Sequence, residues 1–275
     1  MKKIVKALLL SGLCLYASSC VIATPSKWNE YHYDNSGNYS FGDAKIDGEI
    51  TSVDVDWLKG KVNFVTTEDT NVSFTESCSE SLSRNEKVHY WYDARNKELK
   101  IKFFASRSHI DFDEISKELT IYVPTTYTSL SINAKTISAD INSSVPAANN
   151  YNMDTVSGYL RITDADNIDN IEFDSVSGNV NVNCNTITFF DSDTTSGDMN
   201  ITTNDASRIE SDSVSGDLTI NIPETLGFYV EYDTIGKNFS TNANARINGN
   251  KCYYRDEKVK INFDSVSGDI EVNVR

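Results

Sequence analysis

The chain has 275 residues, a formal net charge of −15 at pH 7 and an apolar fraction of 39%. A surface this acidic repels nucleic acid and anionic lipid. We therefore expect no nucleic-acid partner, and the charge favours a soluble protein outside the cytoplasm.

Residues 1–19 are predicted to be a secretory signal peptide. Lys2, Lys3 and Lys6 precede an apolar run from Ala7 to Tyr16, which is too short for a stable membrane anchor. Removing the leader would take away three lysines and change the formal charge from −15 to −18. The mature protein is thus expected to be extracytoplasmic.

Two ways of processing this leader stay open. Ala17-Ser-Ser-Cys20 resembles the bacterial lipobox, which makes Cys20 the candidate lipidation site. That motif prefers Leu where this chain has Ala17, and ordinary cleavage after Ala23 is the alternative. The protein is predicted to be lipid-anchored in the cell envelope or secreted, with membrane contact only through Cys20.

Residues 20–40 are rich in Tyr, Asn and Ser without a clear period, which predicts a tether. Residues 41–124 contain short segments of alternating apolar and polar residues, which predict strands that cap the repeat region. The segments are Ile50–Trp57, Val62–Val65, Val72–Phe74, Val88–Tyr92, Leu99–Phe103 and Leu119–Val123.

Residues 125–275 contain a repeated phrase, Asp-(Ser/Thr)-(Val/Thr)-Ser-Gly, whose first four glycines are 20, 19 and 19 residues apart. Short alternating runs flank each phrase, so each period holds two strands joined by a tight corner. We predict an all-β fold, a parallel β-solenoid of 19–20-residue coils with an irregular insertion near 237–258. The corner glycines are Gly158, Gly178, Gly197, Gly216 and Gly268.

Aligning the repeats on the glycine predicts three core columns. The first is Val156, Val176, Thr195, Val214 and Val266; the second is Leu160, Val180, Met199, Leu218 and Ile270; the third is Ile162, Val182, Ile201, Ile220 and Val272. The inward phase slips by one residue between Phe173 and Val176, which predicts a bend at that point.

Turn chemistry accounts for the repeated phrase without a ligand. Asp and Ser bond to nearby backbone N–H groups, and Gly supplies a positive φ or room for a neighbouring backbone. Calcium binding is the alternative, because the repeated aspartates would form columns of like charge with a spacing of ~5 Å. Calcium-binding β-rolls use a nonapeptide, so we prefer turn capping. The aspartates are Asp154, Asp174, Asp193 and Asp212, followed by Asp264.

A polysaccharide-cleaving β-helix is the enzyme alternative, with Asp191 and Asp193 as an acid/base pair. The repeats contain few cationic residues, and alternation places this pair beside a corner without loops that would build a cleft. The histidines His32, His89 and His109 lie outside the repeats. We therefore predict no catalytic residue, no cofactor and no enzymatic activity.

Three cysteines follow Cys20. Cys184 continues the inward phase of Val180 and Val182, which predicts a small buried side chain. Cys78 and Cys252 could form a disulfide in an oxidising compartment, although spacing alone does not fix their geometry.

Several segments resemble the bacterial candidate-adhesin family of β-strand-repeat domains, a domain family of unknown function. They are Val53–Trp57 followed by Gly60–Val62, Leu119–Pro124, Ile220–Pro223 followed by Gly227-Phe228, and Phe263–Ile270. Together they span about residues 42–275. The resemblance implies an extracytoplasmic β-solenoid with an adhesin role and brings no catalytic residues.

The sequence thus predicts a non-enzymatic adhesin or cell-envelope scaffold whose partner is an unidentified protein or glycan at the cell surface. Flat faces lined by Thr, Asn and Ser would bind extended partners through many weak contacts. Aromatic residues supply either stacking surfaces or parts of the tether and core: Trp28, Tyr31, Tyr33, Tyr39 and Trp91.

Overall fold

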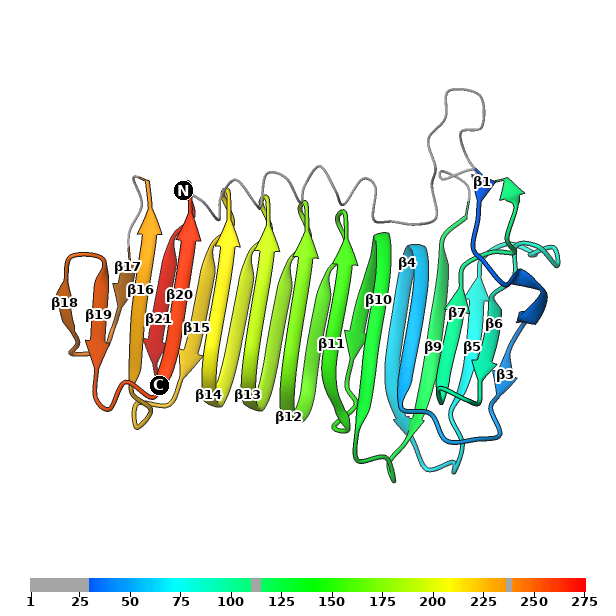
Figure 1. Ribbon diagram of the computed structural model, residues 1–275, viewed down its shortest axis with the longest axis horizontal. Coiled ribbons are helices and arrows are strands. Elements are labelled where there is room, and N and C mark those ends of the chain that lie inside the picture. Colours follow the sequence, from blue (N-terminus) through cyan, green and yellow to red (C-terminus); the bar gives the residue numbers. More distant parts are fainter. Residues whose placement is uncertain (1–29, 110–114, 236–238) are drawn as a thin grey trace.

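The computed structural model describes residues 30–109, 115–235 and 239–275 and is built almost entirely of strands (Figure 1). The predicted all-β class is confirmed. Its one helical turn within these ranges is the 3-10 helix η1 (Ser36–Asn38). No helix of the described residues is long and apolar enough to span a membrane. The predicted signal peptide and Cys20 lie outside the described residues.

The N-terminal part combines long and short strands at one end of the molecule (Figure 1). Its strands are β1 (Glu30–Tyr31), β2 (Ser40–Phe41), β3 (Ala44–Lys45), β4 (Ser52–Thr67), β5 (Ser73–Cys78), β6 (His89–Asp93), β7 (Glu98–Lys102), β8 (Ser108–His109) and β9 (Lys117–Pro124). The six predicted strand segments all fall within or beside these strands. β4 pairs in parallel with β7 and β9, whereas β5 and β6 add antiparallel neighbours.

The remaining strands form a solenoid-like stack of parallel neighbours (Figure 1). They are β10 (Leu130–Ser143), β11 (Ala148–Thr155), β12 (Leu160–Ser175), β13 (Val180–Thr194), β14 (Met199–Ser213), β15 (Leu218–Ile222), β16 (Phe228–Thr234), β17 (Phe239–Thr241), β18 (Arg246–Asn248), β19 (Lys251–Tyr254), β20 (Val259–Ser265) and β21 (Ile270–Val274).

Each long strand turns back on itself, so the stack has two layers (Figure 1). In β13, residues 180–184 form the first arm and residues 186–194 the second. The first arm follows a glycine corner and the second arm leads to the next corner. Because residue 180 pairs with 199 and residue 190 with 209, both arms keep the same register against β14.

Spatial order departs from chain order at the C-terminal end. β20 pairs with β14 on one side and with β16 on the other, and β21 likewise lies between β15 and β17. The last strands of the chain are therefore inserted between earlier ones. Within the segment predicted to be irregular, β18 and β19 form an antiparallel hairpin that pairs with β16.

The core lies between the two layers. The second and third predicted columns are buried throughout, but the first is wrong: Val156, Val176 and Val214 are only half-buried. The residue before each of them points inward instead. Buried and less buried residues alternate from Phe173 through Ser175, and this alternation breaks only before Gly178. The phase slip therefore falls after the interval between Phe173 and Val176 in which it was predicted. The buried column is Thr155, Ser175, Thr194, Ser213 and Ser265.

Two further serines replace aromatic residues inside the stack. Phe173, Ser192, Ser211 and Phe263 are register partners on successive strands. Ser192 is 1% exposed and Ser211 is 0% exposed, and neither hydroxyl has a hydrogen-bond partner. The middle of the core therefore contains two unsatisfied polar groups.

Lys117 is buried at the N-terminal end, next to Trp57 and Phe103. Its Nζ lies 2.6 Å from Glu76 Oε1, donates to the carbonyl oxygen of Glu86 at 2.8 Å and also donates to that of Phe103. Burial lowers the pKa of Lys117 to about 8, although the Glu76 carboxylate opposes this shift. The ammonium group holds together three segments that close this end.

Residues 31–40 differ from the tether predicted for residues 20–40. Tyr31 is fully buried, Tyr33 is 9% exposed, and β1 pairs with β8. The hydroxyl of Tyr31 accepts the backbone N–H of Phe103 at 3.1 Å, so a neighbouring segment supplies the structure that local periodicity does not indicate.

The cysteines are all free in the described residues. Cys184 and Cys252 are buried, as predicted for Cys184. Cys78 ends β5 and Cys252 lies in β19, and these strands are at opposite ends of the molecule (Figure 1). The pairing considered for Cys78 and Cys252 is therefore excluded within one chain, because a disulfide requires the two Cα atoms to be within ~7 Å.

Candidate interaction faces

Each glycine corner is held by the hydroxyl group of the Ser or Thr three residues before the glycine. Gly158 N–H donates to Thr155 Oγ1 at 2.8 Å, and Gly268 N–H donates to Ser265 Oγ at 2.8 Å. The serine before each glycine links to the previous corner, as Ser177 Oγ donates to the Val156 carbonyl at 3.3 Å. The structure thus gives the corner residues a role in the stack itself.

The glycines are required by close approach between neighbouring corners. A Cβ at Gly178 would lie 2.2 Å from the carbonyl oxygen of Gly158, and one at Gly197 would lie 1.8 Å from that of Gly178. Neither has a positive φ. Of the two reasons considered for glycine, the structure selects room for the neighbouring backbone. Gly268 meets Gly216 in this way, consistent with insertion of the last coil beside β14.

The aspartates after the glycines form a hydrogen-bonded ladder. Asp217 N–H donates to Asp198 Oδ1 at 3.0 Å, and Asp269 N–H donates to Asp217 Oδ1 at 2.7 Å. Asn179 occupies the same place one corner earlier and accepts from Asp198 N–H at 2.8 Å. Each side chain therefore joins two successive corners, which explains an acidic residue here without a ligand.

The aspartates before the corners form a continuous column on the outside of the second arms, in what we call the acidic face. Asp154, Asp174, Asp193, Asp212, Asp264 and Asp233 are successive register partners. Lys135 Nζ lies 3.5 Å from Asp154 Oδ2 at one end of the column. Burial, and then the carboxylates of Asp193 and Asp154, raise the pKa of Asp174 to about 7.

Among the residues that the structure describes, no group of three or more His, Cys, Asp or Glu side chains is arranged to hold a metal ion. Asp191 and Asp193, the pair considered for catalysis, face outward from β13 beside the corner on an open sheet, with neighbouring strands on both sides.

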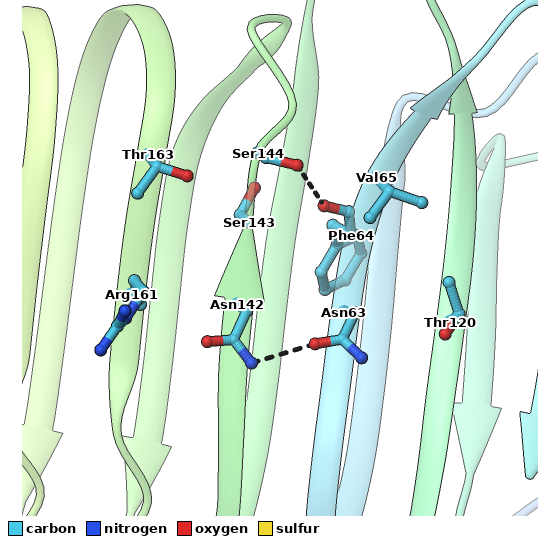
Figure 2. Close-up of a pocket in the computed structure, with 9 residues that line it drawn as sticks. All are labelled: Asn63, Phe64, Val65, Thr120, Asn142, Ser143, Ser144, Arg161 and Thr163. Atoms are coloured by element: carbon cyan, nitrogen blue, oxygen red, sulfur yellow. Dashed lines mark hydrogen bonds between the residues drawn. The ribbon is translucent and has the colours of Figure 1, made fainter.

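The first arms carry an outer surface with few charged residues, which we call the amide face. Its outward residues are mostly Asn and Thr, and they line up in register across the stack: Asn63, Asn142, Arg161, Asn181, Asn200 and Thr219. Asn142 Nδ2 donates to Asn63 Oδ1 at 3.0 Å (Figure 2). Asn221 Nδ2 likewise donates to Asn200 Oδ1 at 3.2 Å.

A shallow pocket of about 240 Å³ opens in the amide face (Figure 2). Asn63, Asn142 and Arg161 form one row across neighbouring strands at this pocket. Ser144 Oγ donates to the Phe64 carbonyl at 3.4 Å. Amide and guanidinium groups of this kind can bond to hydroxyls or to peptide groups of an extended partner.

A second cleft, also of about 240 Å³, lies at the N-terminal end of the acidic face. Tyr39 lies between Tyr33 and Trp91, with ring centroids 4.7 and 5.9 Å away. Lys102 forms a buried ion pair with Asp56. Burial raises the pKa of Asp54, against the effect of the Lys102 ammonium. Three of the aromatic residues singled out from the sequence thus meet here, whereas Tyr31 is core and Trp28 lies outside the described residues.

A family model described as Toastrack DUF4097 matches residues 49–275. The chain belongs to the Toastrack DUF4097 family. The predicted family resemblance is confirmed, and the match covers both the N-terminal strands and the repeats of this Toastrack chain.

Solved structures similar to the Toastrack chain include proteins from Parabacteroides and Bacteroides species. A candidate adhesin from Parabacteroides merdae is 12% identical over 88% of this chain and 98% of its own, with a TM-score of 0.48. A candidate adhesin from Bacteroides fragilis is 13% identical over 85% and 96%, with a TM-score of 0.49. A candidate lipid-binding protein from Parabacteroides distasonis is 10% identical over 86% and 97%, with a TM-score of 0.40. No curated protein matches the chain.

Proposed function

We propose that this Toastrack protein is a non-enzymatic interaction module outside the cytoplasm, acting as an adhesin or as a scaffold of the cell envelope. The observation that supports the proposal is the pair of open, polar faces whose side chains repeat in register over successive strands. Such faces offer many equivalent weak contacts to an extended partner, and they hold their spacing because the strands are fixed at ~4.8 Å intervals.

The proposal includes the organisation of the chain. Residues 125–275 would form a parallel β-solenoid of 19–20-residue coils, capped by residues 41–124. Residues 1–19 would be the leader, and Cys20 the acylated first residue of a lipid-anchored protein. The parallel pairing of residues 19 or 20 apart supports the coil period.

Processing is tested on protein exported by its own cells. Mass spectrometry of the N-terminal peptide distinguishes an acylated Cys20 from cleavage after Ala23. We expect Cys20→Ala to move the protein from the membrane fraction to the soluble fraction. If the variant partitions with membranes as the wild type does, anchoring at Cys20 is wrong.

The interaction role is tested with beads coated with the purified mature protein. We expect these beads to be retained on intact cells or on isolated cell envelopes, in contrast to beads coated with an unrelated acidic protein. Reducing-end assays on polysaccharides should show no depolymerisation. Equal retention of both bead types on every surface would reject the proposal, as would measurable depolymerisation.

A further inference from the structure

One line of side chains on the acidic face differs from its surroundings by combining aromatic rings with cations. Its members are register partners on six neighbouring strands: Phe189, Arg208, Lys260, Tyr229, Tyr253 and Arg246. We call this line the aromatic-cation row. It crosses the C-terminal end of the stack, where β20 is inserted and the β18–β19 hairpin is attached.

Contacts within the row keep its rings and cations in order. Lys260 Nζ lies 5.1 Å from the ring centroid of Tyr229, and the rings of Tyr229 and Tyr253 are 5.3 Å apart. Arg246 Cζ lies 4.5 Å from the ring centroid of Tyr253, and Arg208 Cζ lies 5.8 Å from that of Phe189. The rings of the row are half-buried, whereas its cationic side chains are exposed.

The adjoining row supplies hydrogen-bonding groups of both signs. It contains Asp191, Glu210, Asn262, Glu231 and Lys251. Arg208 Nη2 is 2.5 Å from Glu210 Oε1, and the Tyr229 hydroxyl donates to Glu231 Oε2 at 2.8 Å. Charges of opposite sign thus neutralise one another locally, although the protein as a whole is strongly acidic.

The two rows border a depression of about 380 Å³. Arg208, Glu210, Tyr229, Glu231 and Lys260 line it, and Ile261 and Asn262 complete the lining. Phe189 and Tyr229 are three strand spacings apart, which places two aromatic platforms ~14 Å from each other. The row is therefore long enough to contact several units of a polymer.

We propose that the aromatic-cation row binds an extended, uncharged polysaccharide. The C–H faces of sugar rings would pack on Tyr229, Tyr253 and Phe189, and sugar hydroxyls would bond to the planar guanidinium, carboxylate and amide groups beside them. An acidic polysaccharide would be repelled by Glu210, Glu231 and the aspartate column.

This proposal rests on the proposed interaction function and names its ligand. Affinity electrophoresis of the purified mature protein through gels containing soluble β-glucan, mannan or dextran tests it, with polygalacturonate as the acidic comparator. We expect at least one neutral polysaccharide to slow migration, with little change when salt is added. Tyr229→Ala and Arg246→Ala should each weaken that retardation about tenfold.

Tyr159→Ala is the matched control, because Tyr159 lies beside the amide face and its ring also holds an arginine, Arg161, at 5.4 Å. It should bind as the wild type does. Melting temperatures identify any variant that fails to fold. If Tyr229→Ala does not fold, Arg246→Ala tests the row, because the Arg246 side chain is exposed. Absence of retardation by all three neutral polymers overturns the proposal, as does equal weakening by Tyr159→Ala.

Salt-sensitive binding to polygalacturonate alone also overturns it and identifies an ionic surface instead. The bead-retention experiment distinguishes failure of the polysaccharide proposal from failure of the proposed interaction function. If beads carrying Tyr229→Ala stay on cells or envelopes as wild-type beads do, the interaction function holds and the aromatic-cation row is not its site.

Discussion

Buried hydroxyl groups occur in two chemically different settings in this protein. The hydroxyl of Ser213 accepts the N–H of Gly216 at 3.1 Å and donates to its carbonyl oxygen at 3.0 Å. Ser192 and Ser211 are equally buried but lack any such partner. A buried polar group is favourable only when it is bonded, so these serines contribute oppositely to stability.

Ser192→Ala is therefore expected to raise the free energy of unfolding by about 1 kcal/mol, because it removes an unsatisfied hydroxyl and little volume. Ser213→Ala, the paired control, should lower it by about 1–2 kcal/mol. Urea titration of both variants measures the difference. A loss of stability in Ser192→Ala would mean that the hydroxyl binds a buried water.

Asp174 makes stability depend on pH in the direction opposite to that of an ion-paired carboxylate. Its folded-state pKa of about 7 lies above the ordinary aspartate value of 3.8, so the folded state binds the proton more tightly than the unfolded state. Its contribution to stability is present at low pH and is lost as pH rises from about 4 to about 7. Asp174→Asn should flatten this fall and stabilise the protein above pH 7.

Thermal unfolding at pH 5 and at pH 8 measures the effect of Asp174→Asn. Asp166→Asn, in the exposed bend of the same strand β12, is the matched control and should keep the wild-type slope. If Asp174→Asn shows the same pH dependence as the wild type, the acidic column does not retain protons in the folded state.

At the scale of elements, the distance between successive corners depends on glycine. In Gly178→Ala, the added Cβ would lie 2.2 Å from the carbonyl oxygen of Gly158. That oxygen belongs to the backbone, so it cannot move aside as the end of a flexible side chain can. We expect a loss of about 1–3 kcal/mol, as for other overpacked sites. Gly37→Ala, at a position with nothing within 4 Å, should change stability little. Equal melting temperatures for the two variants would contradict this account.

Sequence patterns predicted the strands and corners of the repeat region, but only part of its core. The period from Gly158 to Gly216 was sufficient to place strands, corners and two core columns. Val156 and its equivalents were misassigned because an apolar residue next to a corner resembles a core residue, whereas the buried Thr155 carries a polar group. Only its bond to Gly158 N–H makes burial acceptable, and such bonds are not visible in hydrophobic periodicity.

The aromatic-cation row could not be predicted for a related reason. Arg208 and Lys260 are adjacent only because β20 lies beside β14, and the phrase ending at Gly268 has the same form as the others. Gly268 meets Gly216 because β20 pairs with β14 and β21 pairs with β15, which the repeated phrase does not indicate. Long-range pairing of this kind depends on chain topology rather than on local composition.

For the whole molecule, repulsion between like charges is the dominant long-range interaction. The net charge of −15 and the aspartate column oppose compaction, and added salt screens this repulsion. We expect the melting temperature to rise with sodium chloride and to rise equally with calcium chloride at the same ionic strength. A dedicated calcium site would add stability by mass action beyond screening. An additional rise of several degrees with calcium would therefore support the calcium alternative.

The position of β20 and β21 between strands that precede them in the chain has a consequence for biosynthesis. The ribosome makes β20 after both of its neighbours, β14 and β16, and it makes β21 after both of its own, β15 and β17. Until β20 and β21 have been made, one space in the stack stays open and strand edges on both sides of it lack their partners. This end of the stack can therefore close only after the ribosome has made residues 259–274.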